Sequence, residues 1–362
     1  MQTFLKYHIK EYLNYTLLFF IVFILIISLI KWVLVVEKLI EFNPSFFNLV
    51  VIFLLILIQF ISFTLPLSAF MGVLFSLHRM GVENEILGFY TLGLSIKDFL
   101  KPLLLFAFIV FVLTFINRCY ILPRVKRTQK LIKIELIKKQ MSQPIPSKKP
   151  YPLGKNGFIY VVNSKKEGNE NKLEGIFFLT RREPQKTGIF IAKDGAIIYK
   201  KNLFILNNGW GFFRDVKKNI EILKFEKYIL KISFSNSVKS LYFKRGEKTL
   251  KELKNDIKKI TSKERRYRYL TEYYHRFLYA FSVILLTISA FILSFYMKVS
   301  HKFLIFFLGM GFYLIFYTIY DFLISLAESG KVHPLMAYLI FYGLFIILLS
   351  FMYLRVKKKQ FG

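Results

Sequence analysis

Apolar runs without a single charge recur near both ends of the chain. They cover residues 12–30, 42–78, 102–117, 277–297, 303–320 and 332–354. A bilayer core about 30 Å thick is crossed by about 20 residues of helix at 1.5 Å per residue. The run at 102–117 reaches this length because Arg118 can extend its guanidinium to the headgroups. The pattern predicts six membrane-spanning helices, three on each side of a long polar segment.

Two of these runs could be interpreted in more than one way. The run at 42–78 is too long for one straight span and too short for two spans with a turn, so we expect one helix that projects beyond the bilayer, with a kink at Pro66. The run at 12–30 is followed by Lys31 and Trp32 instead of a small-residue cleavage site. It is therefore predicted to be a helix that stays in the protein and not a signal peptide.

In the central segment, apolar and polar residues alternate over much shorter distances than in the six runs. Short β-branched and aromatic stretches alternate with Gly, Asn, Asp and Lys clusters, which is typical of an all-β sandwich or open barrel. The Asp194-Gly195 and Asn208-Gly209 pairs are typical of hairpin turns. The expected strands are 158–162, 173–180, 188–193, 196–199, 203–206 and 220–225.

Basic helical patterns flank these strands and are predicted to connect them to the spans. They cover Lys126–Gln140 and Lys248–Lys259, and an entry linker is marked by Pro144, Pro146, Pro150 and Pro152. We therefore divide the chain into helices one to three (1–122), an inserted β-domain with its connectors (123–271) and helices four to six (272–362).

Charges in the short loops predict the orientation. If the N-terminus lies inside, the inner pieces are rich in Lys and Arg, whereas the short outer loops hold only Lys38 and Lys331. This bias predicts that both termini are cytoplasmic and that 123–271 lies outside. The inner basic residues are Lys6, Lys10, Arg79, Lys97, Lys101, Lys298, Lys302, Arg355 and Lys357 to Lys359.

Composition agrees with a membrane protein. The chain is 55% hydrophobic and has a net charge of +31, and its mean hydropathy is +0.44. Such apolar content excludes a soluble protein and a disordered chain. The single cysteine excludes a disulfide framework and Cys-rich zinc or iron–sulfur sites. The basic excess would also suit a nucleic-acid-binding protein, but the apolar runs favour the membrane.

The sequence predicts no catalytic centre, metal site or cofactor. A Walker A motif is missing, because Gly154-Lys155 and Gly330-Lys331 are not followed by Ser or Thr. H-E-x-x-H and G-x-S-x-G are also missing. Cys119 is expected to be a small buried hydrophobe. The histidines are expected to be interfacial side chains and not ligands: His8, His78, His275, His301 and His333.

The loop between helices two and three contains a short amphipathic pattern at about 83–94. Glu83 and Glu85 stand at its start, where the helix dipole favours carboxylates. The segment is either an interfacial helix or a coupling helix that docks into a cytoplasmic partner. Its apolar face is formed by Ile86, Phe89, Tyr90 and Gly93.

Four charges are expected near the outer headgroups. Helix rise puts Lys31, Arg118 and Asp321 about 28, 24 and 27 Å from the inner ends of their apolar runs, and Lys38 lies just beyond Lys31. These residues are either snorkelling anchors or a site for an anionic lipid headgroup, which Lys and Arg would hold by charge-assisted hydrogen bonds.

Three stretches in this order resemble the LptF/LptG family, the permease subunits of the lipopolysaccharide-export ABC transporter. The similarity covers nearly the whole chain. The first stretch resembles the family's R…E-S-E…G-(I/L)-S…P loop, the second its β-jellyroll and the third its E-x-H/x-R entry into helix four. They are Arg79…Glu83-Asn-Glu85-Ile…Gly93-Leu-Ser95…Pro102; Gly157-Phe-Ile-Tyr160…Leu173-Glu-Gly175-Ile…Ile191-Ala-Lys-Asp-Gly195…Leu203; and Thr271-Glu272-Tyr-Tyr-His275-Arg276-Phe277.

This resemblance implies a fold and a mechanism. Two permease subunits, a hetero- or homodimer, would pack around a cavity that takes lipopolysaccharide from the outer leaflet of the bacterial inner membrane. Helices one and five would form the gates. A cytoplasmic ABC ATPase dimer would bind Glu85, with Glu83 and Arg79 beside it. Lys31 and Lys38 lie where family members have basic residues that meet substrate phosphates. The periplasmic jellyroll-like domain would pass lipid to periplasmic bridge jellyroll proteins by edge pairing.

Two other functions are left open. The first is a membrane-anchored periplasmic scaffold or adaptor without transport activity, which would explain six helices poorly because one is enough for anchoring. The second is an intramembrane enzyme acting on lipid headgroups, for which only Asp321 and Glu328 come near a pair of carboxylates. The leading hypothesis is a lipid-exporting permease that hydrolyses no ATP itself.

Overall fold

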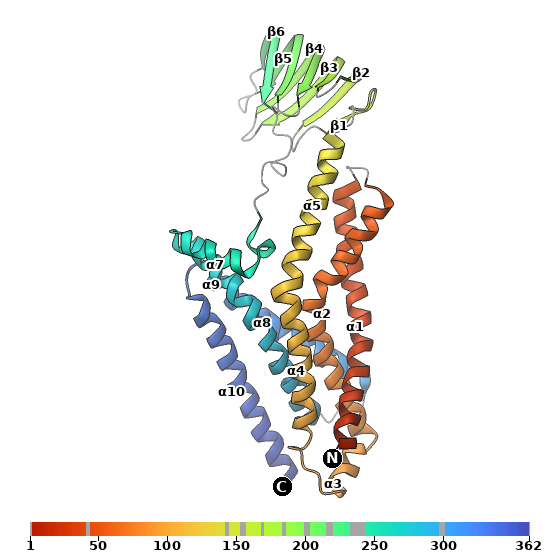
Figure 1. Cartoon of the computed structure of the whole chain (residues 1–362), viewed down its shortest axis with the longest axis vertical. Coiled ribbons are helices and arrows are strands. Elements are labelled where there is room, and N and C mark those ends of the chain that lie inside the picture. Colours follow the sequence, from red (N-terminus) through yellow and green to blue (C-terminus); the bar gives the residue numbers. More distant parts are fainter. Residues whose placement is uncertain are drawn as a thin grey trace. The chain divides into compact units, whose positions relative to one another are not determined.

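The computed structural model describes residues 2–40, 44–141, 145–152, 157–167, 170–182, 186–198, 203–214, 220–231, 243–296 and 301–361. Its contacts divide the chain into two compact units. The helical unit comprises Met1–Lys38, Ser45–Gln129 and Phe243–Gly362, and the second unit comprises Leu39–Pro44 and Lys130–Tyr242 (Figure 1). The linker residue Pro144 and the loop residue Lys298 lie outside the described residues.

Six helices are long and apolar enough to cross a membrane, as predicted. From Phe46 on, the uncharged run at 42–78 belongs to one helix, α2, with Pro66 inside it and Ser45 Oγ capping its start by accepting from Asn48 N at 3.4 Å. The helices before the sheet are α1 (Gln2–Leu39), α2 (Phe46–Val82), α3 (Glu85–Thr91), α4 (Leu100–Ile116) and α5 (Leu122–Met141), and a π-helical turn, η2 (Asn117–Ile121), joins the last two.

The helices after the sheet begin with short connectors. Thr249 caps α7 by accepting from Glu252 N, and the Glu252 carboxylate accepts in turn from Thr249 N. Helix α8 begins fourteen residues before its apolar run, and Tyr269, Thr271 and Arg276 of this polar part are buried in the protein. These elements are η4 (Arg245–Glu247), α7 (Leu250–Lys259), α8 (Lys263–Tyr296), α9 (Lys302–Glu328) and α10 (Pro334–Phe361).

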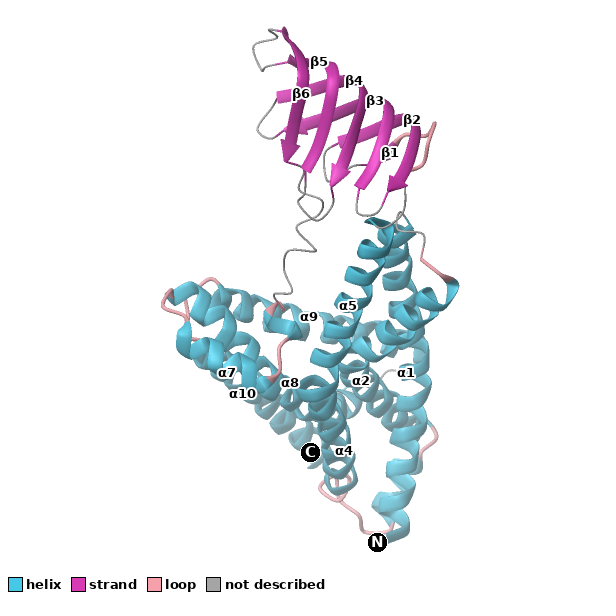
Figure 2. Cartoon of the chain, turned by 45° about the horizontal axis from the view of Figure 1, so that its top comes forward, coloured by secondary structure: helices cyan, strands magenta, loops and turns pink. Residues whose placement is uncertain are grey.

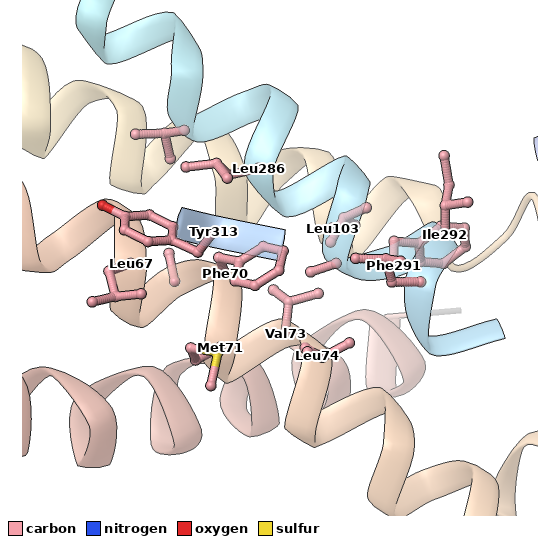
Figure 3. Close-up of a cluster of buried hydrophobic side chains, with 14 of the residues drawn as sticks. Leu67, Phe70, Met71, Val73, Leu74, Leu103, Leu286, Phe291, Ile292 and Tyr313 are labelled. Atoms are coloured by element: carbon pink, nitrogen blue, oxygen red, sulfur yellow. The ribbon is translucent and has the colours of Figure 1, made fainter. Parts of the chain in front are cut away.

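The core of the helical unit surrounds α8. Its most apolar window is 67% buried, more than in the other five candidate spans. Figure 3 shows Phe70 and Leu74 of α2 in the cluster with Leu103 of α4, Phe291 of α8 and Tyr313 of α9. The helices approach closely, since a Cβ on Gly309 of α9 would lie 2.6 Å from Leu74 Cδ2.

The inserted strands form one sheet, as an all-β domain predicts, and they follow one another in space as they do in the chain (Figure 2). Every neighbouring pair is antiparallel. Among the described strands this is a meander, so the two-layer sandwich and the crossover of a jelly roll are not seen there. The strands are β1 (Tyr151–Pro152), β2 (Gly157–Glu167), β3 (Glu170–Arg182), β4 (Lys186–Ile198), β5 (Leu203–Arg214) and β6 (Ile220–Lys231).

The two predicted hairpin turns are wrong. Asp194-Gly195 lies inside β4 and Asn208-Gly209 inside β5. A Cβ on Gly195 would lie 2.4 Å from Ile205 O, and one on Gly209 would lie 2.3 Å from Ile191 O. These glycines therefore allow two strands to approach closely, a role that turn propensity cannot distinguish from a turn.

A crease crosses the sheet next to these glycines. The ladder between β3, β4 and β5 skips Gly175, Lys193 and Asn208, and Gly175 (φ 62°) and Asn208 (φ 51°) have left-handed backbone. On β3, Leu173 and Ile176 are both buried although residues three apart in a regular strand face opposite sides. The crease thus bends strands of eleven to thirteen residues while their register is kept.

Candidate functional site

A cluster of charges joins three helices at the end of α2. Arg79, in the last turn of α2, donates from Nη1 to Glu85 Oε1 at 2.7 Å and from Nη2 to Glu11 Oε2 at 3.2 Å. It also pairs with Glu83. Because Glu11 belongs to α1 and Glu85 to α3, one guanidinium ties α1, α2 and α3 together.

Tyr7 of α1 completes this cluster. Its hydroxyl donates to Glu85 Oε2 at 2.7 Å and accepts from Arg79 Nη2 at 3.1 Å. Burial raises the pKa of Glu85, but the Tyr7 hydrogen bond and the Arg79 charge lower it more, so the net shift is downward. Glu85 is therefore a carboxylate with both oxygens bound, and it fixes the first turn of α3.

Backbone geometry sets the bounds of α3, which is shorter than the predicted 83–94. Asn84 has a left-handed backbone (φ 57°), so Glu83 caps α2 instead of starting α3. Gly93 (φ 80°) ends α3 in a Schellman motif, in which Leu94 N donates to Phe89 O at 3.1 Å and Gly93 N donates to Tyr90 O at 3.0 Å.

Helix α3 has two different faces. Ile86, Phe89 and Tyr90 pack against the core, and the Phe89 ring lies 5.1 Å from the ring of Phe4. On the other face Leu87 is 59% exposed, and Leu92 just beyond the helix is 76% exposed. The inner face is thus held by α1 and by the core, whereas the outer face presents apolar side chains beside the charge cluster.

A second site is a polar cavity of about 220 Å³ within the helical unit. It lies between η2, the start of α5, the first part of α8 and the end of α9, and it is lined by three cations and three carboxylates. Its charged and polar lining residues are Arg118, Lys126, Thr271, Glu272, His275, Arg276, Asp321 and Glu328.

Arg276 is the most buried of the cations, with 2% of the residue exposed. Its Nε donates to Glu272 Oε1 at 3.2 Å and its Nη2 to Arg245 O at 3.1 Å. Within the described part of the chain its Nη1 has no partner. A buried guanidinium N–H without an acceptor is costly, and the Arg276 charge beside the cavity favours an anionic group there.

His275 and Arg118 lie together on the other side of the cavity. The Arg118 guanidinium contacts His275 Nε2 and lies 4.1 Å from the ring centroid of Tyr279. Arginine can only donate, so His275 Nε2 accepts and its Nδ1–H donates to the Tyr320 hydroxyl at 2.8 Å. The neutral histidine therefore orients Arg118 without adding charge.

The structure brings together two of the four predicted headgroup residues. Arg118 and Asp321 both line the cavity. Lys31 is exposed on α1 and is not among the residues that line it, and the side chain of Lys38 lies outside the described residues.

Two expectations about histidines are corrected. His8 and His78, predicted to be interfacial, are 0% and 5% exposed. The His8 ring packs against the rings of Phe4, Phe89 and Phe99, and its Nδ1 bonds to Phe4 O at 2.9 Å. Cys119 is buried as predicted, and its thiol donates to Arg276 O at 3.4 Å. Among the described residues no group of three His, Cys, Asp or Glu side chains could hold a metal ion.

Sequence reasoning missed Lys126, Glu272 and Arg276 as members of one site. A signal was present, because each contributing helix supplies lining residues at helical spacing. Arg118, Leu122 and Lys126 are four apart, Glu272, His275 and Arg276 span one turn, and Asp321, Ile324 and Glu328 span two. The spacing shows that these residues share one face of their own helix. Only the folded structure shows which helix faces pack together.

One family model matches the chain. It is described as lipopolysaccharide export system permease LptF/LptG, and it matches residues 6–355. None of the curated proteins matches.

Proposed function

The chain belongs to the LptF/LptG family of lipopolysaccharide export permeases, and from this we propose which of its residues receive energy and which meet the lipid. It is a multi-pass protein of an inner-membrane family and a subunit without catalytic activity of the lipopolysaccharide export ABC transporter. Family membership implies the transporter complex, whereas the individual partners and steps below are proposed.

Energy enters at α3. A cytoplasmic ABC ATPase dimer docks on the exposed face that carries Leu87 and Leu92, next to Glu83 and Glu85. The Arg79 cluster supports this assignment because it joins α3 directly to α1 and α2, so that a displacement of α3 moves the ends of both helices. The chain itself has no Walker A motif, which agrees with ATP hydrolysis in a separate subunit.

The polar cavity receives an anionic part of the lipid headgroup. Arg118 and Lys126 supply donors, Arg276 adds positive charge, and Asp321 and Glu272 balance these charges. Phosphate and carboxylate oxygens accept charge-assisted hydrogen bonds of this kind. Lys31 and Lys38 of α1 would contact the headgroup on its way from the outer leaflet.

The sheet passes the lipid onward. One face of it is apolar, and Phe190, Phe213 and Tyr228 line a cavity of about 190 Å³ there, which suits acyl chains. Strand β6 is an edge of the described sheet, so a strand of a periplasmic bridge protein could pair with it. This route requires cytoplasmic termini, residues 123–271 in the periplasm and a second permease subunit to close the lipid path.

The observation that carries this proposal is the hydrogen bonding of Glu85 to both Tyr7 and Arg79. The test is lipopolysaccharide release from proteoliposomes that contain the complete complex and ATP. Glu85→Ala should reduce release about tenfold or more, because a charged pair and a hydrogen bond at the input are lost together.

The matched control is Glu264→Ala, which removes a side chain that is 68% exposed at the start of α8 and should leave release unchanged. Both variants should assemble with the ATPase as the wild type does. Release by Glu85→Ala at the wild-type rate would contradict the proposed coupling role.

A further inference from the structure

The acidic and basic side chains of helix α7 (Leu250–Lys259) have different surroundings. Leu253, on the inner face, is 0% exposed. Both acidic residues of the helix are engaged by the protein: Glu252 accepts from Arg127 of α5 at 3.0 Å, and Asp256 pairs with Lys248. The exposed face carries four lysines, Lys251, Lys254, Lys258 and Lys259.

This basic face continues into the start of α8. Lys263, Arg265 and Arg266 are exposed there, and among the described residues none of these seven cations forms an ion pair. The acidic side chain on this surface, Glu264, lies 3.8 Å from Arg268. We call the seven residues Lys251, Lys254, Lys258, Lys259, Lys263, Arg265 and Arg266 the basic collar.

Neighbouring contacts fix the level of the collar along the spans. A Cβ on Gly330, between α9 and α10, would lie 3.4 Å from Glu264 Cγ. The rings of Tyr267 and His333 are 5.6 Å apart, and the uncharged run of α10 begins at residue 332. Figure 1 shows α7 lying crosswise at this end of α10. The collar is therefore level with the point where α10 enters the hydrocarbon.

We propose that the basic collar binds anionic phospholipid headgroups in the leaflet around α8, α9 and α10. Among the described residues its cations form no ion pair, although Lys263 Nζ lies 5.7 Å from the ring centroid of Tyr267, and they are adjacent and at headgroup level. The apolar side of α7 is turned into the protein, so the helix presents charge to the membrane surface and does not insert. Lysines are flexible point charges, which suits fluid phosphodiester headgroups better than one rigid ligand. This binding is independent of lipid export.

The expected strength follows from the number of charges. Each Lys or Arg near an anionic surface contributes about 1 kcal/mol, which is about a fivefold change in binding. Even partial engagement of four lysines should enrich anionic lipid near α7 about threefold or more over zwitterionic lipid.

The test is energy transfer in nanodiscs. A donor dye is attached to Asn255→Cys, an exposed position on α7, in a Cys119→Ala background. The acceptor is chain-labelled phosphatidylglycerol or phosphatidylcholine at equal dilution. The proposal predicts higher transfer to phosphatidylglycerol, and a rise in salt from about 0.1 M to about 0.5 M should remove most of the difference.

Two variants with the same loss of charge complete the test. Changing Lys251, Lys254, Lys258 and Lys259 to Gln should bring the two lipids to equal transfer. Changing Lys149, Lys165, Lys193 and Lys227 to Gln, all exposed residues of the second unit, should leave the preference intact. Circular dichroism shows whether both variants keep the wild-type helix content.

The wild type alone can overturn the proposal. Equal transfer to both lipids in the wild type, or a preference that survives the α7 substitutions or high salt, would contradict it. If the wild type shows no lipid preference while the α7 substitutions release an acidic protein from the purified complex, the collar serves a protein partner and the lipid proposal is wrong.

Discussion

Arg79 and Arg276 each hold a guanidinium between helices, and their surroundings give them different roles. Arg79 is surrounded by Glu11, Glu83 and Glu85, and its side chain is 19% exposed. Arg276 is 2% exposed and pairs with one carboxylate, Glu272. Arg79 is thus bound by three carboxylates of its own protein and serves as a joint between helices, although its Nε has no partner among the described residues. Arg276 has a single carboxylate partner, so its charge is less fully balanced beside the polar cavity.

Lys126 should contribute directly to headgroup binding. It lines the cavity, and its Nζ lies over Gly246, where a Cβ would be only 3.3 Å away. Lys126→Gln removes one charge-assisted hydrogen bond and should weaken lipopolysaccharide binding about tenfold. Equilibrium titration in detergent measures this. Lys133→Gln, which alters an exposed lysine of the same helix, should bind like the wild type, and equal binding by both variants would exclude Lys126 from the site.

The Glu85 carboxylate should make α3 sensitive to acid. Burial raises its pKa, but the Tyr7 hydrogen bond and the Arg79 charge outweigh burial and keep the pKa below the ordinary 4.5. The stabilisation is therefore complete above about pH 4.5 and is lost as pH falls through the lower folded-state value.

Thermal unfolding of the wild type and of Glu85→Gln at a series of pH values measures this effect. The wild type should have the higher midpoint from about pH 7 down to about pH 5, and the two midpoints should converge in stronger acid. A difference that grows on acidification would mean that protonated Glu85 is the stabilising form, contrary to the observed contacts.

At the scale of elements, charge-free runs predict the spans well because lipid tolerates few charges at its centre. They predict the helix ends less well, because polar turns can continue a helix when protein covers them. Helix α8 is the clear case: Lys263 to Arg276 precede its apolar run, and Tyr338 OH donates to Thr271 O at 3.4 Å in this part.

The sheet shows a second limit of local patterns. Asp-Gly and Asn-Gly pairs favour turns, yet at 194–195 and 208–209 they lie inside long strands, where the glycines make room for the neighbouring backbone. Close packing between neighbouring strands outweighs the turn preference of these pairs. Sequence spacing alone cannot show that packing.

Gly209→Ala should therefore destabilise the sheet. Its Cβ would lie 2.3 Å from Ile191 O and 2.8 Å from Phe225 Cζ, so a backbone atom has to move, at a cost of about 1–3 kcal/mol. Trp32→Phe leaves Trp210 as the sole tryptophan, and its fluorescence reports on β5 during urea unfolding.

Gly343→Ala provides the control for this substitution. Nothing lies within 4 Å of its added Cβ, and alanine is about 1 kcal/mol better than glycine in a helix. This variant should leave the Trp210 transition unchanged. If Gly209→Ala also leaves it unchanged, the close approach of β4 and β5 is not required by the fold.

At the scale of the whole molecule, α2 connects the two sites. Arg79 holds α3, and Ser62 of the same helix accepts from Arg118 at the polar cavity at 3.4 Å. The two residues are separated by about 26 Å at 1.5 Å per residue, which is close to the thickness of the bilayer core. Energy input and lipid binding would thus occur at opposite membrane surfaces on one continuous helix.

Most of this layout could be predicted from the sequence, and the assembly of the cavity could not. The order of spans and β-domain follows from hydropathy and period. Arg118 and Asp321 are predicted at a similar depth, whereas Lys126 and Arg276 join them only because η2, α5, α8 and α9 turn particular faces toward one another. Tertiary contacts of this kind are not encoded in any local spacing.

The most direct test of this account is two-sided cysteine labelling in cells with a permeabilised outer membrane. In a Cys119→Ala background, Leu92→Cys reports on the end of α3 and Lys193→Cys on the sheet; both positions are exposed. A membrane-impermeant thiol reagent should label Lys193→Cys at once, and Leu92→Cys only after the inner membrane is opened. Labelling of Leu92→Cys in intact inner membranes, or protection of Lys193→Cys, would contradict a permease driven from α3.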